Sequence, residues 1–197
     1  MSSVIDLRTY VGASNSRLLV MIDLQQKNHD ELAKDRASDL SRSLENCMSA
    51  IGHARNLGLP IAFTRQADHP GSIEGSPQSA WIPGFEPKRS DMVFERPQPS
   101  CYTNRLFEDV VSRVGSFAIA GLVAEETCLA TAIDAAHRGH HITFLSDASV
   151  SRGRHNSDSQ AVHTLTTKAI ELFADTVTTR HWLVATSPRT PKGHRYG

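Results

Sequence analysis

The chain has 197 residues, a length that suits one domain with a sizeable core. Hydrophobic residues make up 39% of it and charged residues 21%, as in an ordinary globular protein. The 21 basic residues balance 21 acidic ones, so the formal net charge is zero. This excludes nucleic acid and anionic membranes as expected partners, because both require a basic excess, and it is compatible with self-association.

The cysteines and the N-terminus indicate a cytoplasmic protein. Cys47, Cys101 and Cys128 are odd in number and include no CxxC pair, so they predict neither a disulfide framework nor a metal or redox site. The N-terminal segment lacks the basic start and long apolar run of a signal peptide. No stretch approaches the roughly 20 apolar residues of a membrane span.

The chain is predicted to form one domain over residues 17–186, with a leader at 1–16 and a mobile basic tail at 187–197. The domain begins with a continuous apolar run over 17–24, which is typical of a strand buried on both faces of a parallel sheet. Asp23 places a carboxylate at the carboxyl end of this strand.

A helix is predicted over residues 35–57, where apolar side chains recur every three or four residues before Gly58. Cys47 lies in this stripe and is interpreted as a buried small hydrophobe. Residues 66–91 contain Pro, Gly and Ser throughout, which indicates a lid or binding loop. The later elements alternate between apolar runs and helical patterns: strands over 60–64, 92–96, 116–123, 141–145 and 176–184, and helices over 102–114, 127–138 and 157–174.

Strands that alternate with helices predict a three-layer α/β fold, doubly wound and Rossmann-like, with a mainly parallel six-stranded sheet and helices on both faces. Ligands of such sheets bind beyond the carboxyl ends of the strands. That rule selects Asp23, Arg96 and the turn over residues 123–128 as neighbours in one crevice. The turn opens a helix, and a helix N-terminus favours a thiolate or an oxyanion.

Six segments in this order carry a family resemblance: LLVMIDLQQ (18–26), GLPIAFTR (58–65), WIPGFEP (81–87), FERPQPSCYTNRL (94–106), AIAGLVAEETCLATAIDAAHRGH (118–140) and ITFLSDAS (142–149). Together they resemble the isochorismatase-like (cysteine hydrolase) superfamily, which includes nicotinamidases, carbamoyl-amide hydrolases and isochorismatases. The resemblance implies a hydrolase of a small amide, carbamoyl or enol-ether metabolite that needs no cofactor and assembles as a homo-oligomer. It covers most of residues 17–184.

Two of the three family catalytic positions are atypical in this chain. The family's Asp at the end of the first strand matches Asp23, but its Lys, four residues before a Ser-Ala-Phe-like segment, falls on Arg96. Arginine keeps the positive charge but does not give up its proton. The resemblance therefore implies that Arg96 retains anion stabilisation and loses proton shuttling.

The family's nucleophilic cysteine falls on Thr127, six residues after Gly121 and seven before Asp134, and Cys128 is one step later. One helical step rotates a side chain by about 100°, so Cys128 and Thr127 cannot face the same way. Either a locally shifted turn presents Cys128 as the thiolate nucleophile, or Cys128 packs in the core and Thr127 caps the turn with its hydroxyl. The spacing favours the second interpretation. Thr127 as a nucleophile requires a base, and Asp23 is the evident one.

Two mechanisms follow from the resemblance. In an amidase, Asp23 takes the proton of Cys128, and backbone amides near Ala124 hold the oxyanion beside a cis peptide expected at Val123–Ala124. In an isochorismatase, Asp23 is a general acid on a vinyl ether, and Arg96 holds a substrate carboxylate. A third possibility is a catalytically impaired member that binds a metabolite or serves as an assembly partner.

Further residues are candidates for substrate binding. They are Gln25, Trp81, Tyr102 and Ala124. His69 resembles part of the nicotinamidase metal site, but the family's Asp-x-His after Thr-Arg is here Gln66-Ala67-Asp68. The sequence therefore predicts no metal.

Overall fold

The computed structural model describes residues 18–67, 80–153 and 158–188. The predicted leader and the tail beyond residue 188 lie outside these ranges, as do residues 68–79 of the predicted lid. Within the described ranges, no helix is both long and apolar enough to cross a membrane.

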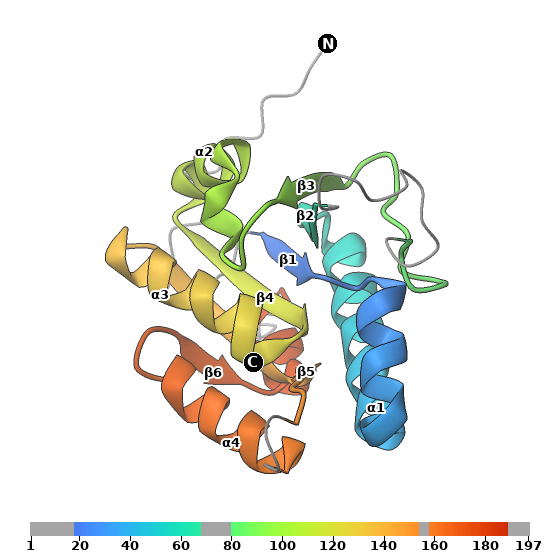
Figure 1. The fold of residues 1–197 in the computed structure, drawn as a ribbon. Coiled ribbons are helices and arrows are strands. Elements are labelled where there is room, and N and C mark those ends of the chain that lie inside the picture. The colour runs from blue at the N-terminus through green and yellow to red at the C-terminus, as the bar shows by residue number, and fades with distance from the viewer. Residues whose placement is uncertain (1–17, 68–79, 154–157, 189–197) are drawn as a thin grey trace, which may run out of the picture.

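Six strands form a single sheet: β1 (Leu19–Ile22), β2 (Ile61–Gln66), β3 (Met92–Arg96), β4 (Ser116–Leu122), β5 (His141–Val150) and β6 (Asp175–Val177). Their order in space is β3-β2-β1-β4-β5-β6, and every pairing is parallel (Figure 1). The predicted doubly wound α/β sheet is confirmed. Its topological switch point lies between β1 and β4, which pair at the centre and whose following segments leave on opposite sides.

Five helices cover the two faces: α1 (Gln26–Leu57), α2 (Arg105–Val114), α3 (Leu129–His137), α4 (Ser159–Ile170) and α5 (Thr179–Thr186). The helices α1 and α5 pack on one face, and α2, α3 and α4 pack on the other (Figure 1). Alternate residues of the central strands therefore contribute to two separate apolar cores.

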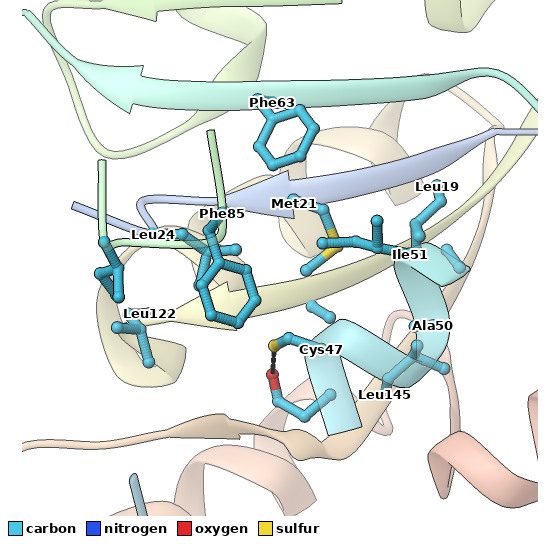
Figure 2. Packing of buried hydrophobic residues seen from close by; sticks show 14 of the residues in the cluster. Leu19, Met21, Leu24, Cys47, Ala50, Ile51, Phe63, Phe85, Leu122 and Leu145 are labelled. Atoms are coloured by element: carbon cyan, nitrogen blue, oxygen red, sulfur yellow. Dashed lines mark hydrogen bonds between the residues drawn. The ribbon is translucent and has the colours of Figure 1, made fainter. Parts of the chain in front are cut away.

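Cys47 lies in the core beneath α1, as the sequence predicts. Figure 2 shows it beside Met21 and Ala50, in the apolar layer between the helix and the sheet. Its sulfur donates a hydrogen bond to the carbonyl of Ala148 at 3.1 Å. The thiol is thus a packing group that also satisfies a backbone acceptor of β5.

The first helix is longer than predicted, because it begins at Gln26 and not at residue 35. Its first turns are rich in polar helix formers and bury only Leu32, so they lack the apolar stripe on which the prediction relied. The backbone at Arg36 is non-helical, with φ −137° and ψ 30°, which divides the early polar part from the later apolar part.

The prediction of a strand over 176–184 is wrong beyond Val177, because the chain turns into α5 at Thr179. Thr178 caps this helix by accepting from the amide of His181 at 3.3 Å. Its Trp182 is buried against His53 of α1, with ring centroids 5.5 Å apart. Burial of this indole favours a helix over a weak edge strand.

Two smaller differences occur at the ends of other elements. The helix predicted over 157–174 is α4, which spans Ser159–Ile170, and its N-cap Asp158 accepts from the amide of Ala161 at 3.3 Å. The fifth strand continues past residue 145 to Val150 through an irregular segment. Its pairing with β4 jumps from Ile119–Phe144 to Gly121–Ser149.

Candidate active site

Asp23 follows β1 directly, in an unusual backbone conformation. Its φ is +49°, in the left-handed region that residues other than Gly, Asn and Asp rarely adopt. The Asp23 amide donates to the carbonyl of Thr64 at 2.9 Å, and its carbonyl accepts from Nδ2 of Asn28 at 3.0 Å. These two bonds hold the residue in place just beyond the sheet.

A glycine brings the end of β4 close to Asp23. Gly121 pairs with Ile22 and has a φ of +126°, and a Cβ built on it would lie 2.0 Å from the Ile22 carbonyl oxygen. No other residue can occupy this position without displacing a strand. The close pairing brings the turn that follows β4 to Asp23.

Three side chains from different parts of the sequence meet at this point. Arg96 ends β3, and its Nη2 donates both to Asp23 Oδ2 and to Thr127 Oγ1, the latter at 2.9 Å. The Thr127 hydroxyl donates to the same Asp23 oxygen at 3.1 Å. All three residues are nearly excluded from solvent, with 4% of Asp23, 2% of Arg96 and 2% of Thr127 exposed.

Burial makes Asp23 a weaker acid than usual. Loss of solvent raises the pKa of its carboxyl to about 6 from an ordinary value of 3.8. The Arg96 charge and the Thr127 hydrogen bond oppose this pKa shift without cancelling it. Among the described residues, Asp23 Oδ1 has no hydrogen-bond partner. The two carboxyl oxygens therefore differ, because Oδ2 accepts both contacts of the cluster while Oδ1 accepts none among the described residues.

The turn after β4 separates Thr127 from Cys128. It is a π-helical turn over Ala124–Cys128, in which the Thr127 amide donates to the carbonyl of Val123 at 3.2 Å. Cys128 is fully buried in the core beneath α3, and burial raises the pKa of its thiol well above the usual value. The structure therefore brings the Thr127 hydroxyl to Asp23 and leaves the Cys128 thiol buried in the core cluster.

The non-proline cis peptide is one residue earlier than expected. It joins Leu122 to Val123, so its expected position at Val123–Ala124 is wrong. Ala124, a substrate-binding candidate, is fully buried, and its carbonyl accepts from the amide of Leu129. The backbone of Ala124 therefore supports the turn that carries Thr127.

Two other substrate-binding candidates, Gln25 and Trp81, lie together near Asp23. Their backbones form an isolated antiparallel bridge, and Gln25 Oε1 accepts from the amide of Gln66 at 3.1 Å. The half-buried Trp81 ring lies edge-on to Phe63, with centroids 5.7 Å apart. This places an aromatic ring at the carboxyl edge of the sheet, opposite Gln25, which follows Asp23 by two residues.

The structure does not bring Tyr102 to Asp23. The Tyr102 hydroxyl lies 2.6 Å from Nδ1 of His140, which precedes β5 at the opposite edge of the sheet. The Arg138 guanidinium lies over the Tyr102 ring, 4.5 Å from its centroid. Tyr102 thus packs between α2 and the end of α3, and the family's aromatic position here does not point toward the carboxylate.

Sequence reasoning missed three residues around the cluster, namely Cys101, Asn28 and Arg152. Cys101 is fully buried, and the charges of Arg96 and Asp23 both act on the pKa of its thiol, which burial raises. Arg152 donates to Asn28 Oδ1 at 2.6 Å, and Asn28 in turn holds the Asp23 carbonyl. Cys101 could have been found from its place five residues after Arg96. Arg152 follows an irregular strand and gave no signal in the sequence.

The predicted absence of a metal concerns His69, which lies outside the described residues. Within the ranges that the structure describes, no group of three or more His, Cys, Asp or Glu side chains is placed to hold a metal ion.

Residues 17–181 match the sequence model of the isochorismatase domain family. No curated protein sequence matches the chain significantly. Among solved structures, a proposed isochorismatase from Burkholderia xenovorans is 24% identical with a TM-score of 0.75, over 87% of this chain and 88% of that one. A cysteine hydrolase from Pseudomonas syringae is 16% identical with a TM-score of 0.78, over 86% and 92%. The MAR1 ribonuclease of Caenorhabditis elegans is 20% identical with a TM-score of 0.67, over 92% and 87%. Likeness at these identities establishes the fold and leaves the substrate open.

Proposed function

The chain belongs to the isochorismatase family of hydrolases, and on that basis we propose that it hydrolyses a small enol-ether metabolite by acid–base catalysis at Asp23. The proposal rests on one observation, which is the side chain that contacts the Asp23 carboxyl. A threonine hydroxyl contacts Asp23 Oδ2, while the neighbouring Cys128 thiol is fully buried in the core. A mechanism that needs no thiolate fits this arrangement better than the family's cysteine mechanism.

In the proposed reaction, protonated Asp23 delivers its proton to the terminal carbon of the enol ether. The electrons of the C=C bond form the new C–H bond, and the ether oxygen stabilises the cation left on the adjacent carbon. Water adds to that carbon and gives a proton to the Asp23 carboxylate. The resulting hemiketal collapses to a ketone and an alcohol, so Asp23 returns to its starting state. A pKa of about 6 suits this role, because both forms of the carboxyl are accessible near neutral pH.

Arg96 has a supporting role in this proposal. Its Nη1 donates to the carbonyl of Gln98 at 2.8 Å, and its Nη2 donates to Asp23 and Thr127. Both hydrogens of Nη2 therefore already serve protein acceptors, so the bidentate grip on a substrate carboxylate suggested by the resemblance would require at least one Nη2 contact to break. Arg96 instead orients the acid and the hydroxyl.

The pH dependence of turnover tests the proposal. With isochorismate as the enol-ether probe, kcat/KM is expected to fall as pH rises through about 6, because the protonated form of Asp23 is the active one. A profile that rises through the same pH would show that Asp23 acts as a base and would overturn the general-acid mechanism. A set of small amides, assayed in parallel, provides the comparison substrate class.

A second candidate is amide or carbamoyl hydrolysis with Thr127 as the nucleophile. The observation in its favour is the hydrogen bond from Thr127 Oγ1 to Asp23 Oδ2 at 3.1 Å, within reach for proton transfer. Asp23 would take the hydroxyl proton while the Thr127 oxygen bonds to the acyl carbon, and the C–N bond would then break as Asp23 returns that proton to the departing amine. Water would hydrolyse the resulting ester, which releases the acid and restores the Thr127 hydroxyl. Mass spectrometry of a quenched reaction would detect an acyl group on Thr127, and Thr127→Val would abolish it.

Absence of turnover on both substrate sets would favour the third possibility, a member that binds a metabolite or assembles with other chains. Homo-oligomerisation remains a prediction under each hypothesis. Light scattering during size-exclusion chromatography measures it directly.

A further inference from the structure

Arg152 follows β5 and lies between the start of α1 and the π-helical turn after β4. On the α1 side, its Nη2 donates to Asn28 Oδ1 at 2.6 Å and is paired with Glu31 Oε2 at 3.1 Å. On the side of the turn, its Nη1 lies 3.8 Å from Glu126 Oε2, and its backbone amide donates to Glu125 Oε1 at 3.1 Å. One arginine therefore joins two segments that are distant in the sequence.

The two segments that Arg152 joins both contact the acid–base group of the candidate active site. Asn28 Nδ2 donates to the Asp23 carbonyl at 3.0 Å, and the turn presents the Thr127 hydroxyl to Asp23 Oδ2 at 3.1 Å. We propose that Arg152 is a positioning residue of this site, which holds the Asp23 backbone through Asn28 and screens the carboxyl from a nearby carboxylate. The inference deepens the proposed function and rests on Asp23 as its acid–base group.

The Asp23 backbone depends on its neighbours for its conformation. Its φ of +49° lies in the left-handed region, where a residue stays only if the surrounding contacts hold it. The Asn28 amide supplies one of these contacts, and Arg152 fixes its orientation. Because a guanidinium only donates, Asn28 Oδ1 must face Arg152, and Nδ2 is thereby directed to the Asp23 carbonyl.

Charges around Asp23 give Arg152 its second role. The ionisable side chains that interact electrostatically with Asp23 come from different parts of the chain: Arg96, Cys101, Glu126 and Cys128. Burial is the main cause that raises the pKa of Asp23, the Arg96 charge opposes this rise, and the Glu126 charge adds to it. The Arg152 guanidinium is paired with Glu126, so it offsets a charge that makes Asp23 harder to ionise.

The surroundings of Arg152 contain one further titratable group besides its carboxylate partners. His163 of α4 has its Nδ1 3.2 Å from the hydroxyl of Ser151, which precedes Arg152 in the chain. Burial lowers the pKa of this imidazole below its usual value. A test of the inference must therefore follow the Asp23 carboxyl itself, because a pH profile alone could contain a contribution from His163.

A carboxyl ¹³C NMR titration of the full chain follows that group, and Asp23→Asn identifies its signal. In Arg152→Gln, the titration midpoint is expected to rise above the value of about 6 for the unaltered chain, because Glu126 is no longer screened. Arg152→Lys keeps the positive charge and is expected to bring the midpoint back toward about 6. With isochorismate as substrate, the fall of kcat/KM in Arg152→Gln is expected to move to higher pH in parallel.

Arg138→Gln is the matched control. Arg138 also pairs with two carboxylates, Glu108 and Asp134, and its side chain is 34% exposed against 28% for Arg152. It precedes β5 at the opposite edge of the sheet, so the Asp23 midpoint is expected to stay unchanged. An unchanged midpoint in Arg152→Gln, or equal movement in the two glutamine variants, would overturn the inference. The titration requires no turnover, so a raised midpoint in a chain that hydrolyses no enol ether would support the role of Arg152 and contradict only the proposed reaction.

Discussion

Thr127 and Cys128 are adjacent in the chain but belong to two different regions of the molecule. The Thr127 hydroxyl joins a polar cluster with Asp23 and Arg96, whereas the Cys128 sulfur belongs to the apolar core between the sheet and α3. The same π-helical turn carries both residues. The comparison shows that one residue step on this turn decides which side chain contacts the Asp23 carboxyl, because the two side chains leave the turn in different directions.

The two regions also differ in how far they shift the pKa of an ionisable side chain. In the core, burial is the main cause that raises the pKa of Cys128 well above its usual value, and the nearby Asp23 and Glu125 charges add to it. In the cluster, the nearby Arg96 charge limits the same effect, and the pKa of Asp23 reaches only about 6. A thiol in the first environment stays protonated and inert, while a carboxyl in the second can exchange its proton near neutral pH.

Removal of the carboxyl is expected to have the largest effect on turnover. Asp23→Asn keeps the shape of the side chain but removes its acid–base function, so kcat should fall by about 10²–10⁴-fold. Steady-state kinetics measure this loss, and far-ultraviolet circular dichroism checks that the variant is folded. Turnover within about twofold of the unaltered enzyme would place the chemistry outside the polar cluster.

Loss of Arg96 should have the next largest effect, on stability. Arg96→Met leaves the buried Asp23 carboxylate without its cation, which typically costs about 3–5 kcal/mol. Urea denaturation at pH 8 measures the loss. The double variant with Asp23→Asn serves as the control, because removing the orphaned charge should restore part of the stability. A double variant less stable than Arg96→Met would contradict the ion-pair explanation.

The raised pKa of Asp23 also predicts how stability depends on pH. The folded chain holds this proton more tightly than the unfolded chain, whose carboxyl has an ordinary pKa of 3.8. The stabilising contribution is therefore complete below about pH 3.8 and is lost as pH rises through about 6, an effect of about 3 kcal/mol. The difference in the free energy of unfolding between Asp23→Asn and the unaltered chain should follow this curve. A difference that does not vary over pH 4–7 would mean that the carboxyl titrates normally.

Substitution in the core should have the smallest effect. Cys128→Ala removes a buried sulfur and is expected to cost about 1 kcal/mol of stability, with kcat unchanged within about twofold. Cys47→Ala, beneath α1 on the other face, is the matched control for a buried cysteine. Loss of turnover in Cys128→Ala alone would restore the thiolate mechanism and remove the distinction between the two regions.

Thiol labelling tests independently whether Cys128 is reactive in the folded chain. Cys47, Cys101 and Cys128 are all free and buried, so iodoacetamide should modify each of them slowly in the folded chain and quickly in urea. Mass spectrometry resolves the three sites. Fast, selective modification of Cys128 in the native protein would show a reactive thiolate that the polar cluster does not require.

Much of this protein follows from local sequence patterns. Buried strands that alternate with helices are apolar runs bounded by turn residues, and their alternation determined the doubly wound sheet. Asp23 was identifiable because a charge directly after such a strand must lie at the carboxyl edge of the sheet. The family resemblance pointed to Thr127 through its spacing from Gly121 and Asp134, and helical geometry added only that Cys128, one step later, faces another way.

The remaining features of the fold and the candidate site depend on contacts between segments that are distant in the sequence. The contacts of Arg96 with Asp23 and Thr127 depend on the order of β3, β1 and β4 in the sheet, which no local pattern specifies. Residues 179–184 form a helix because this conformation packs Trp182 against His53 of α1. Local propensities are weak compared with burial and ion pairing, so tertiary packing determines the outcome wherever the two compete.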